Sequence, residues 1–126
     1  MSVAPAPLVL VVEDSDAIRA AFTILLEESG YAVAAAATGA EAVRLAQERA
    51  PDLVLLDLGL PDIPGLDVAR RIKAAAPIPI VALTGRDEAA DRDALMAAGC
   101  AAYLVKPVDT QALIRALPGY IATETQ

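Results

Sequence analysis

Short apolar runs recur along the chain at regular intervals. The run LVLL at residues 53–56 has no polar interruption, which is typical of a strand buried on both faces of a sheet. The run at 31–36 is rich in alanine and predicts a strand more weakly. On this pattern, we predict strands over residues 8–12, 31–36, 53–57, 78–83 and 101–105.

The segments between these runs carry apolar residues at helical spacing. In the first segment, Ile18, Phe22 and Leu25 fall on one helix face, and Ser29-Gly30 follows as a stop signal. The predicted helices cover residues 16–28, 38–49, 66–75, 87–98 and 110–117. Pro118-Gly119 is expected to end the last helix, which leaves residues 118–126 as a loose tail.

The regular alternation of strand and helix defines the fold class. Five β-α units of this length predict an α/β fold, in which a parallel sheet carries helices on both faces. The 126 residues fit one domain with a single core. We therefore expect a single domain over residues 1–126, with its core over about 8–117.

Polar side chains follow four of the five predicted strands. Glu13 and Asp14 follow the first strand, Asp57 ends the third, Thr84 follows the fourth and Lys106 follows the fifth. In a parallel sheet, the carboxyl ends of the strands share one edge, and ligands bind there. Three acids, a hydroxyl and an amine are therefore expected to meet at one site.

The composition narrows the chemistry of this site. The chain contains no histidine, which excludes histidine-based nucleophile triads, His-ligated zinc and a phosphohistidine on this chain. The formal charge of −7 argues against a nucleic-acid surface, because phosphate binding requires clustered Lys and Arg.

The sequence also bears on location. No apolar run approaches the roughly 20 residues of a membrane span, and the start has no basic segment of a signal peptide. The one cysteine, Cys100, cannot form an internal disulfide and is expected to be a small packed residue. These features predict a cytoplasmic protein without a membrane segment.

Neighbouring carboxylates require a compensating charge to stay ionised together. A hard cation that prefers oxygen ligands supplies it, and we expect Mg²⁺, with Mn²⁺ as an alternative. Carboxylates, a cation, a hydroxyl and a lysine together suit a phosphoryl group. In this interpretation Asp57 is the nucleophile that forms an aspartyl phosphate, while Lys106 and Thr84 compensate charge on the phosphoryl oxygens.

Four motifs resemble the receiver domain of two-component response regulators, including chemotaxis regulators and the receivers of hybrid sensor kinases. They are VVED, LVLLDLGLPDIPG, ALTG and AAYLVKP, and the similarity extends over about residues 8–117. The resemblance implies a flavodoxin-like (βα)5 fold with a five-stranded parallel sheet in the order 2-1-3-4-5. It also implies a phosphoacceptor signalling domain and not a turnover enzyme.

The resemblance assigns roles to individual residues. It implies that Asp57 is the phosphoacceptor and that Asp14, Asp57 and the backbone carbonyl of Gly59 bind Mg²⁺. Glu13 would act on the cation through water, and Lys106 would pair with the phosphoryl group. The peptide bond between Lys106 and Pro107 is expected to be cis.

Two further residues and two surfaces follow from the same resemblance. Thr84 and Tyr103 would act as the switch pair and change the surface of helix 87–98, strand 101–105 and helix 110–117 for a downstream protein. A histidine kinase or histidine phosphotransfer protein would be the phosphodonor. Its expected docking surface is the apolar start of the first helix with the residue after Pro107, namely Ala17, Ile18, Ala21 and Val108.

Several positions depart from the usual family pattern. Gly59 and Gly85 stand where larger side chains or alanine are common, and Pro64 stands where an acid or a small polar residue is common. None of these departures removes a side chain that takes part in the expected chemistry. The lifetime of the aspartyl phosphate is not predicted by them.

Alternatives remain for single residues and for the function. Glu13 and Asp14 also suit the start of a helix, and Tyr103 suits a half-buried strand position with no switching role. Thr84 could be an ordinary loop hydroxyl and Lys106 a solvated surface lysine. The chain could be a pseudo-receiver that is never phosphorylated, or a receiver cut from a hybrid histidine kinase. A small-molecule phosphatase requires a cap over the nucleophile, and no insertion here is long enough to form one.

Overall fold

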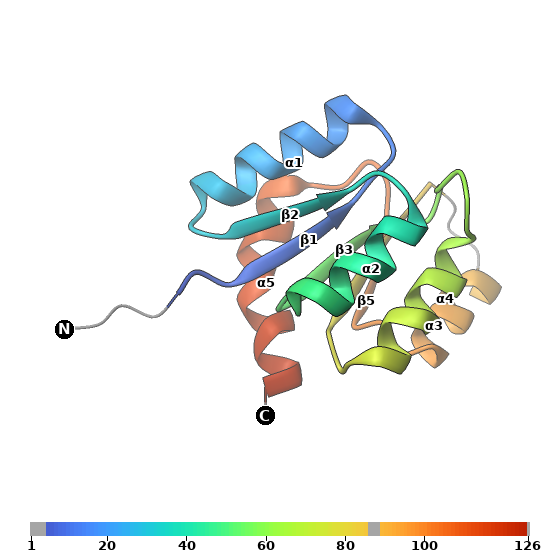
Figure 1. Cartoon of the computed structure of the whole chain (residues 1–126). Coiled ribbons are helices and arrows are strands. Elements are labelled where there is room, and N and C mark those ends of the chain that lie inside the picture. Colours follow the sequence, from blue (N-terminus) through green and yellow to red (C-terminus); the bar gives the residue numbers. More distant parts are fainter. Residues whose placement is uncertain (1–4, 86–88, 126) are drawn as a thin grey trace.

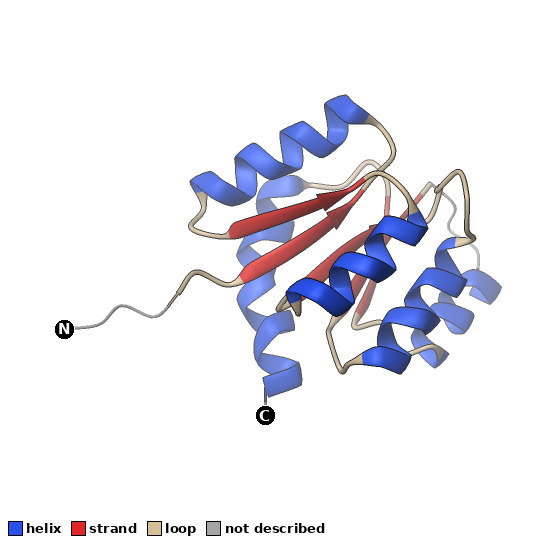
Figure 2. Ribbon diagram, viewed as in Figure 1, coloured by secondary structure: helices blue, strands red, loops and turns tan. Residues whose placement is uncertain are grey.

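A computed structural model describes residues 5–85 and 89–125, and these form a five-stranded parallel sheet with helices on both faces (Figures 1 and 2). The strand order is β2-β1-β3-β4-β5, which confirms the flavodoxin-like prediction. The strands are β1 Leu8–Val12, β2 Ala32–Ala36, β3 Leu53–Asp57, β4 Ile80–Thr84 and β5 Ala102–Val105. The helices are α1 Asp16–Glu28, α2 Gly39–Arg49, α3 Gly65–Ala75, α4 Ala89–Ala97 and α5 Thr110–Thr125.

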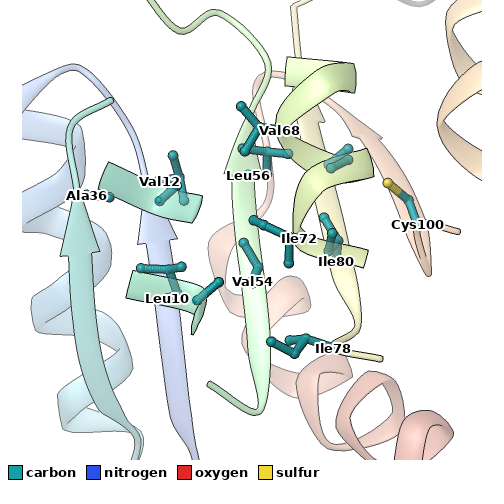
Figure 3. Packing of buried hydrophobic residues seen from close by; sticks show 14 of the residues in the cluster. Leu10, Val12, Ala36, Val54, Leu56, Val68, Ile72, Ile78, Ile80 and Cys100 are labelled. Carbon is teal, nitrogen blue, oxygen red and sulfur yellow. The ribbon is translucent and has the colours of Figure 1, made fainter. Parts of the chain in front are cut away.

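The central strands contribute alternate side chains to two separate cores. One core lies under α2, α3 and α4, and its buried residues include Leu10, Val12, Val54, Leu56, Ile72 and Ile80 (Figure 3). The other, which we name the α1–α5 cluster, consists of Val9, Val11, Leu26, Leu53, Leu55, Val81, Leu83, Leu113 and Leu117. Because both faces are covered, the strands require apolar residues at every position, as the uninterrupted runs predict.

Most predicted element ends agree with the structure to within two residues. Strand β4 begins at Ile80 and not at residue 78, because Pro79 has no N–H to donate to the sheet. The same strand extends to Thr84, which therefore ends a strand instead of following one. The predicted start of the fourth helix, at Asp87 and Glu88, lies outside the described residues.

The last helix differs most from the prediction. We expected Pro118-Gly119 to end it, but α5 continues to Thr125, so that expectation was wrong. Leu117 is fully buried, and Tyr120 and Ile121 pack against the α1–α5 cluster. This burial stabilises the helix beyond Pro118, although a proline inside a helix removes one N–H donor and costs about 3 kcal/mol.

Two smaller predictions can also be compared with the structure. Cys100 is buried and unpaired, as expected of a small packed residue, and burial raises the pKa of its thiol to about 11. Among the described residues, the helices lack the combination of length and apolar character that a bilayer crossing demands.

Candidate functional site

The carboxyl edge of the sheet collects the polar residues that follow the central strands. Glu13 comes directly after β1, and Asp57 and Thr84 are the last residues of β3 and β4. All three are almost fully buried, at 3%, 5% and 6% exposure. The four predicted strand ends therefore meet as expected, since Lys106 follows β5 and its backbone N–H donates to the carbonyl of Thr84.

The carboxylate of Asp57 is held at both oxygens. Its Oδ1 accepts a hydrogen bond from the backbone N–H of Gly59 at 2.9 Å. Its Oδ2 accepts one from the Lys106 ammonium, also at 2.9 Å. The same ammonium lies 3.8 Å from Oε2 of Glu13, so the Lys106 side chain compensates the charge of both buried acids.

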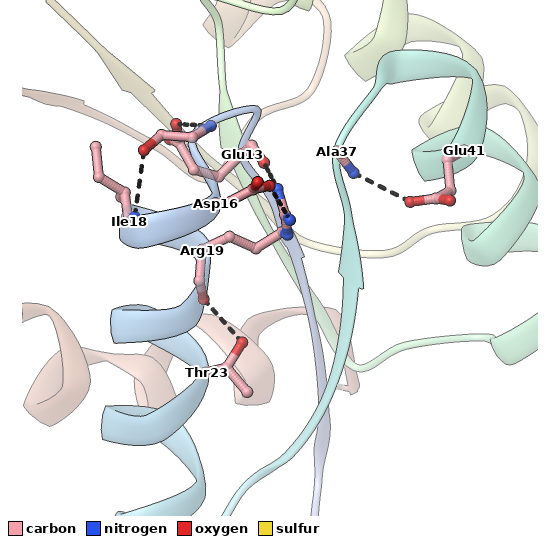
Figure 4. A network of polar contacts seen from close by, with 8 residues as sticks. Glu13, Asp16, Ile18, Arg19, Thr23, Ala37 and Glu41 are labelled. Carbon is pink, nitrogen blue, oxygen red and sulfur yellow. Dashed lines mark hydrogen bonds and ion pairs between the residues drawn. The ribbon is translucent and has the colours of Figure 1, made fainter.

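The loop between β1 and α1 is short and closely bonded. The backbone N–H of Ser15 donates to Oε1 of Glu13 at 3.0 Å, and Glu13 donates its own N–H to the carbonyl of Ala36. Ser15 also caps α1, since its hydroxyl accepts a hydrogen bond from the N–H of Ile18 (Figure 4). This loop presents Asp14, which is exposed, beside the two buried acids.

The three acids fit a divalent cation. Carboxylate oxygens of Glu13, Asp14 and Asp57 lie within 4.8 Å of one another, which is close enough to share an ion. An all-oxygen donor set is what Mg²⁺ and Mn²⁺ prefer. The acids line a cavity of about 770 Å³ that Thr84 and Lys106 also line.

Glu13 and Asp57 titrate as a pair. Burial, followed by hydrogen bonding and repulsion with Asp57, raises the pKa of Glu13 to about 7, although the Ser15 N–H and Lys106 act in the opposite direction. Burial also opposes ionisation of Asp57, but hydrogen bonds with Glu13, Gly59 and Lys106 outweigh it and hold the pKa of Asp57 below its usual value. Protonation is therefore favoured on Glu13 over Asp57.

The loop after β3 is tied to its surroundings at two points. Asp62 accepts hydrogen bonds from the N–H groups of Gly39 and Ala40 at the start of α2, at 2.8 and 3.0 Å. These bonds hold the pKa of Asp62 below its usual value. Gly65 packs so closely on Leu58 that an added Cβ would lie 2.5 Å from a Leu58 methyl carbon. The exposed Gly59 therefore lies in a fixed loop beside Asp57.

Of the remaining predicted residues, only Ile18 is among the described residues that line the acidic pocket. Tyr103 is half-buried against the core under α2, α3 and α4, and the Arg92 guanidinium lies 5.7 Å from the centre of its ring. Ile18 and Val108 line a second cavity of about 460 Å³. Ala17 and Ala21 are exposed on α1 but do not line it. The peptide bond between Lys106 and Pro107 is cis, as predicted.

Two contacts at the site are absent from the sequence-based prediction. Asp62 lies in the loop after β3, but it caps a helix that begins 23 residues earlier in the chain. Arg19 donates to the backbone carbonyl of Glu13, whereas its spacing alone suggests only a pair with Asp16. An acid in a loop and an arginine in a first helical turn are common, so neither carried a specific signal.

Comparisons with known proteins agree with this geometry. A family model described as the response regulator receiver domain matches residues 9–118. The transcriptional regulatory protein AfsQ1 of Streptomyces coelicolor is 41% identical over 107 residues, which cover 85% of this chain and 48% of AfsQ1. The chain thus spans about half the length of that relative. The polar-differentiation response regulator DivK of Brucella ovis is 34% identical over 116 residues, covering 90% of this chain and 94% of DivK.

Solved structures show the same similarity. The receiver domain of sensor histidine kinase PA1611 from Pseudomonas aeruginosa PAO1 superposes with a TM-score of 0.83 and 33% identity, covering 93% of this chain and 98% of that one. That structure is described with a magnesium ion coordinated in the active site cleft. A CheY-like receiver domain protein from Methanospirillum hungatei JF-1 has a TM-score of 0.89 at 26% identity, covering 95% of this chain and 97% of that one.

Proposed function

This chain belongs to the response regulator receiver domain family of two-component signalling, and on that basis we propose that Asp57 accepts a phosphoryl group from a phosphohistidine. The donor is a histidine kinase or a histidine phosphotransfer protein. The observation that carries the proposal is the surroundings of Asp57, where the Lys106 ammonium and the carboxyl groups of Glu13 and Asp14 lie around a buried acid whose pKa is held below its usual value. The protein is then a phosphorylated signalling domain and not a turnover enzyme.

The transfer follows from the positions of the chain's own groups. An oxygen of Asp57 attacks phosphorus, the P–N bond to the donor histidine breaks, and the electron pair of that bond goes to the departing imidazole. Lys106 pairs with one phosphoryl oxygen and Thr84 donates its hydroxyl to another, which compensates the charge as it builds up. The product is an acyl phosphate, which water later hydrolyses.

The acids at the pocket fit a role in holding Mg²⁺ or Mn²⁺. Asp14, Asp57 and the backbone carbonyl of Gly59 are the proposed direct ligands, and Glu13 acts through water. A bound cation supplies charge compensation that allows the carboxylates and the phosphoryl oxygens to approach each other.

The phosphoryl group is proposed to change a distant surface through Thr84 and Tyr103. Thr84 moves toward the phosphoryl group, and Tyr103 turns inward into the space that it leaves. The surface of α4, β5 and α5 then presents a different face to a downstream protein. The half-buried position of Tyr103 beside α4 supports this role, because the ring contacts both the core and Arg92.

The phosphodonor is proposed to dock on the apolar start of α1. Ile18 is 43% exposed and lines the same cavity as Val108, which supports a joint surface with Ala17 and Ala21. We also propose that the protein is cytoplasmic and that this chain does not bind nucleic acid. Chemical-shift mapping with a cognate kinase that left all four residues unperturbed would contradict the docking site.

Intact-mass spectrometry after incubation with acetyl phosphate and Mg²⁺ tests the phosphoacceptor directly. An added mass of about 80 Da is expected in the wild-type protein and is expected to be lost in Asp57→Asn and after chelation. Asp67→Asn, which removes a carboxylate from α3, is the matched control and retains the added mass. If neither acetyl phosphate nor beryllofluoride with Mg²⁺ modifies or binds the wild-type protein, the pseudo-receiver alternative replaces this proposal.

A further inference from the structure

Arg19 joins the first turns of α1 to the end of β1. Its Nη1 donates a hydrogen bond to the backbone carbonyl of Glu13 at 2.9 Å, and its Nη2 pairs with the carboxylate of Asp16 (Figure 4). The side chain is 22% exposed, so most of it lies against the protein. The hydroxyl of Thr23 donates to the carbonyl of Arg19 at 2.8 Å one turn later in the helix. Arg19 is therefore held on a regular helix while it contacts the acidic loop.

Glu13 makes three hydrogen bonds besides its ion pair with Lys106, and Arg19 supplies one of them. The N–H of Glu13 donates to the carbonyl of Ala36 at 3.0 Å, and its carboxylate accepts from the N–H of Ser15 at 3.0 Å. Those two partners are backbone groups that remain after any side-chain substitution. The third hydrogen bond, to the carbonyl of Glu13, depends on the side chain of Arg19.

The carbonyl of Glu13 belongs to the peptide bond that leads into Asp14. A peptide bond is planar, so a donor that holds its oxygen also fixes the direction in which the next residue leaves. A guanidinium donor makes a stronger hydrogen bond than a neutral group and holds two acceptors in a fixed fork geometry. The Arg19 hydrogen bond therefore acts on the peptide that leads into Asp14, whose carboxylate lies beside those of Glu13 and Asp57.

We propose that Arg19 is a positioning residue for the divalent cation at the acidic pocket, acting through the Glu13–Asp14 peptide. This inference rests on the proposed function, since the cation is the one that phosphoryl transfer to Asp57 employs. The direction of the change in Mg²⁺ affinity on substituting Arg19 separates this proposal from a simple charge effect. A guanidinium near the pocket repels a divalent cation, so removing its charge alone would tighten binding. Loss of positioning weakens binding.

Calorimetric titration of the unphosphorylated protein with MgCl₂ provides the test. Arg19→Gln is expected to weaken Mg²⁺ binding by roughly 10-fold, as is common for residues that orient metal ligands. Arg44→Gln is the matched control, because Arg44 makes comparable i,i+3 and i,i+4 ion pairs on α2 with Glu41 and Glu48. Asp16→Asn is the second control and leaves the Arg19 bond to Glu13 in place. Both controls are expected to bind Mg²⁺ as the wild-type protein does.

Amide hydrogen exchange in metal-free protein gives a second readout. Arg19→Gln is expected to speed exchange at Asp14 and Ser15, while the exchange rates in the core strands stay unchanged. An Mg²⁺ affinity that is unchanged or tighter in Arg19→Gln would overturn the proposal, even if the thermal midpoint fell. If Arg19→Gln does not fold, Arg19→Lys replaces it, since Lys retains the charge without the fork. Weaker Mg²⁺ binding by Arg19→Lys supports the positioning role, and wild-type affinity overturns it.

Acetyl phosphate labelling of the same variants separates this inference from the proposed function. Arg19→Gln is expected to accept the phosphoryl group slowly at low Mg²⁺ and at the wild-type rate once Mg²⁺ is saturating. A wild-type protein that binds Mg²⁺ but is never labelled would contradict the phosphoacceptor proposal and leave the role of Arg19 standing. A wild-type protein that binds no Mg²⁺ would overturn both.

Discussion

Strands β3 and β4 are buried at every residue, whereas β2 and β5 at the two edges of the sheet are partly exposed. The last residues of the central strands, Asp57 and Thr84, are almost fully buried polar groups. The group that follows the edge strand β5 is Lys106, whose side chain is 36% exposed. The centre of the sheet therefore holds the proposed phosphoacceptor Asp57 in a buried position, and the Lys106 ammonium reaches it from the edge.

This difference has an energetic reason. A buried carboxylate is costly unless donors and opposite charge surround it, and Asp57 has both in the Gly59 N–H and the Lys106 ammonium. An ammonium on a long flexible stem can reach the acid from the edge and remain partly hydrated. The same edge strand carries Tyr103, so one member of the proposed switch pair lies in a partly exposed strand and the other, Thr84, in a buried one.

The largest expected effect is on the free energy of unfolding, when the same Leu→Ala substitution is made in the central strand β3 and in the edge strand β5. Leu55→Ala in β3 is expected to lower the free energy of unfolding by about 3 to 4 kcal/mol, because Leu55 is 1% exposed and leaves a closed cavity. Leu104→Ala in β5 is expected to cost about 1 to 2 kcal/mol, because that side chain is only partly buried against the same α1–α5 cluster. Urea unfolding of both variants measures the difference. Equal losses would contradict the contrast between centre and edge.

The next effect concerns the Lys106 ammonium, which reaches Asp57 from the end of the edge strand β5. Lys106→Met is expected to slow phosphoryl acceptance from acetyl phosphate by roughly 100-fold, because one preorganised donor to the phosphoryl oxygens is lost. Time-resolved intact mass gives the rate. Lys73→Met is the matched control, since Lys73 is a half-buried lysine on α3 that donates to the carbonyl of Ile78. A wild-type rate in Lys106→Met would remove Lys106 from the chemistry.

A third prediction concerns the pH dependence of the hydrogen bonds by which Asp62, in the loop after β3, holds the start of α2. The Gly39 and Ala40 N–H groups hold the pKa of Asp62 below its usual value. A group with a lowered folded-state pKa stabilises the fold above its unfolded pKa of about 3.9, and this contribution is lost as pH falls through the folded pKa. Asp62→Asn is therefore expected to be less stable than the wild-type protein at neutral pH, and the difference is expected to shrink in acid.

Urea unfolding at several acidic pH values and at pH 7 measures this dependence. Asp93→Asn, which removes an exposed carboxylate from α4, controls for the change in net charge. A stability difference between Asp62→Asn and wild type that stayed constant with pH would show that the helix cap does not depend on the charge of Asp62.

The smallest effect lies at the edge of the sheet. The Arg92 guanidinium over the Tyr103 ring is expected to contribute about 0.5 to 1 kcal/mol to stability. Both residues have further contacts, so single substitutions would mix several effects. A double-mutant cycle with Arg92→Gln and Tyr103→Leu isolates the pair. A coupling energy of zero would show that Arg92 does not hold the ring.

Sequence alone was sufficient for the strands, the fold class and the polar residues that the strand ends bring to the pocket. Uninterrupted apolar runs such as residues 53–56 predict strands that are covered on both faces, and parallel strands must place their carboxyl ends at one edge. The convergence of Glu13, Asp57, Thr84 and Lys106 follows from that topology without any knowledge of distances. Each residue could be placed because its location depends on its own strand.

Only the tertiary structure decided the contacts that join different elements. Pro118 does not end α5, because the burial of Tyr120 and Ile121 against the α1–α5 cluster outweighs a local preference. Asp62 caps α2 and Arg19 holds the carbonyl of Glu13, because packing brings a helix end and a strand end within hydrogen-bond distance. Such contacts depend on the relative placement of two elements, which local residue preferences do not encode.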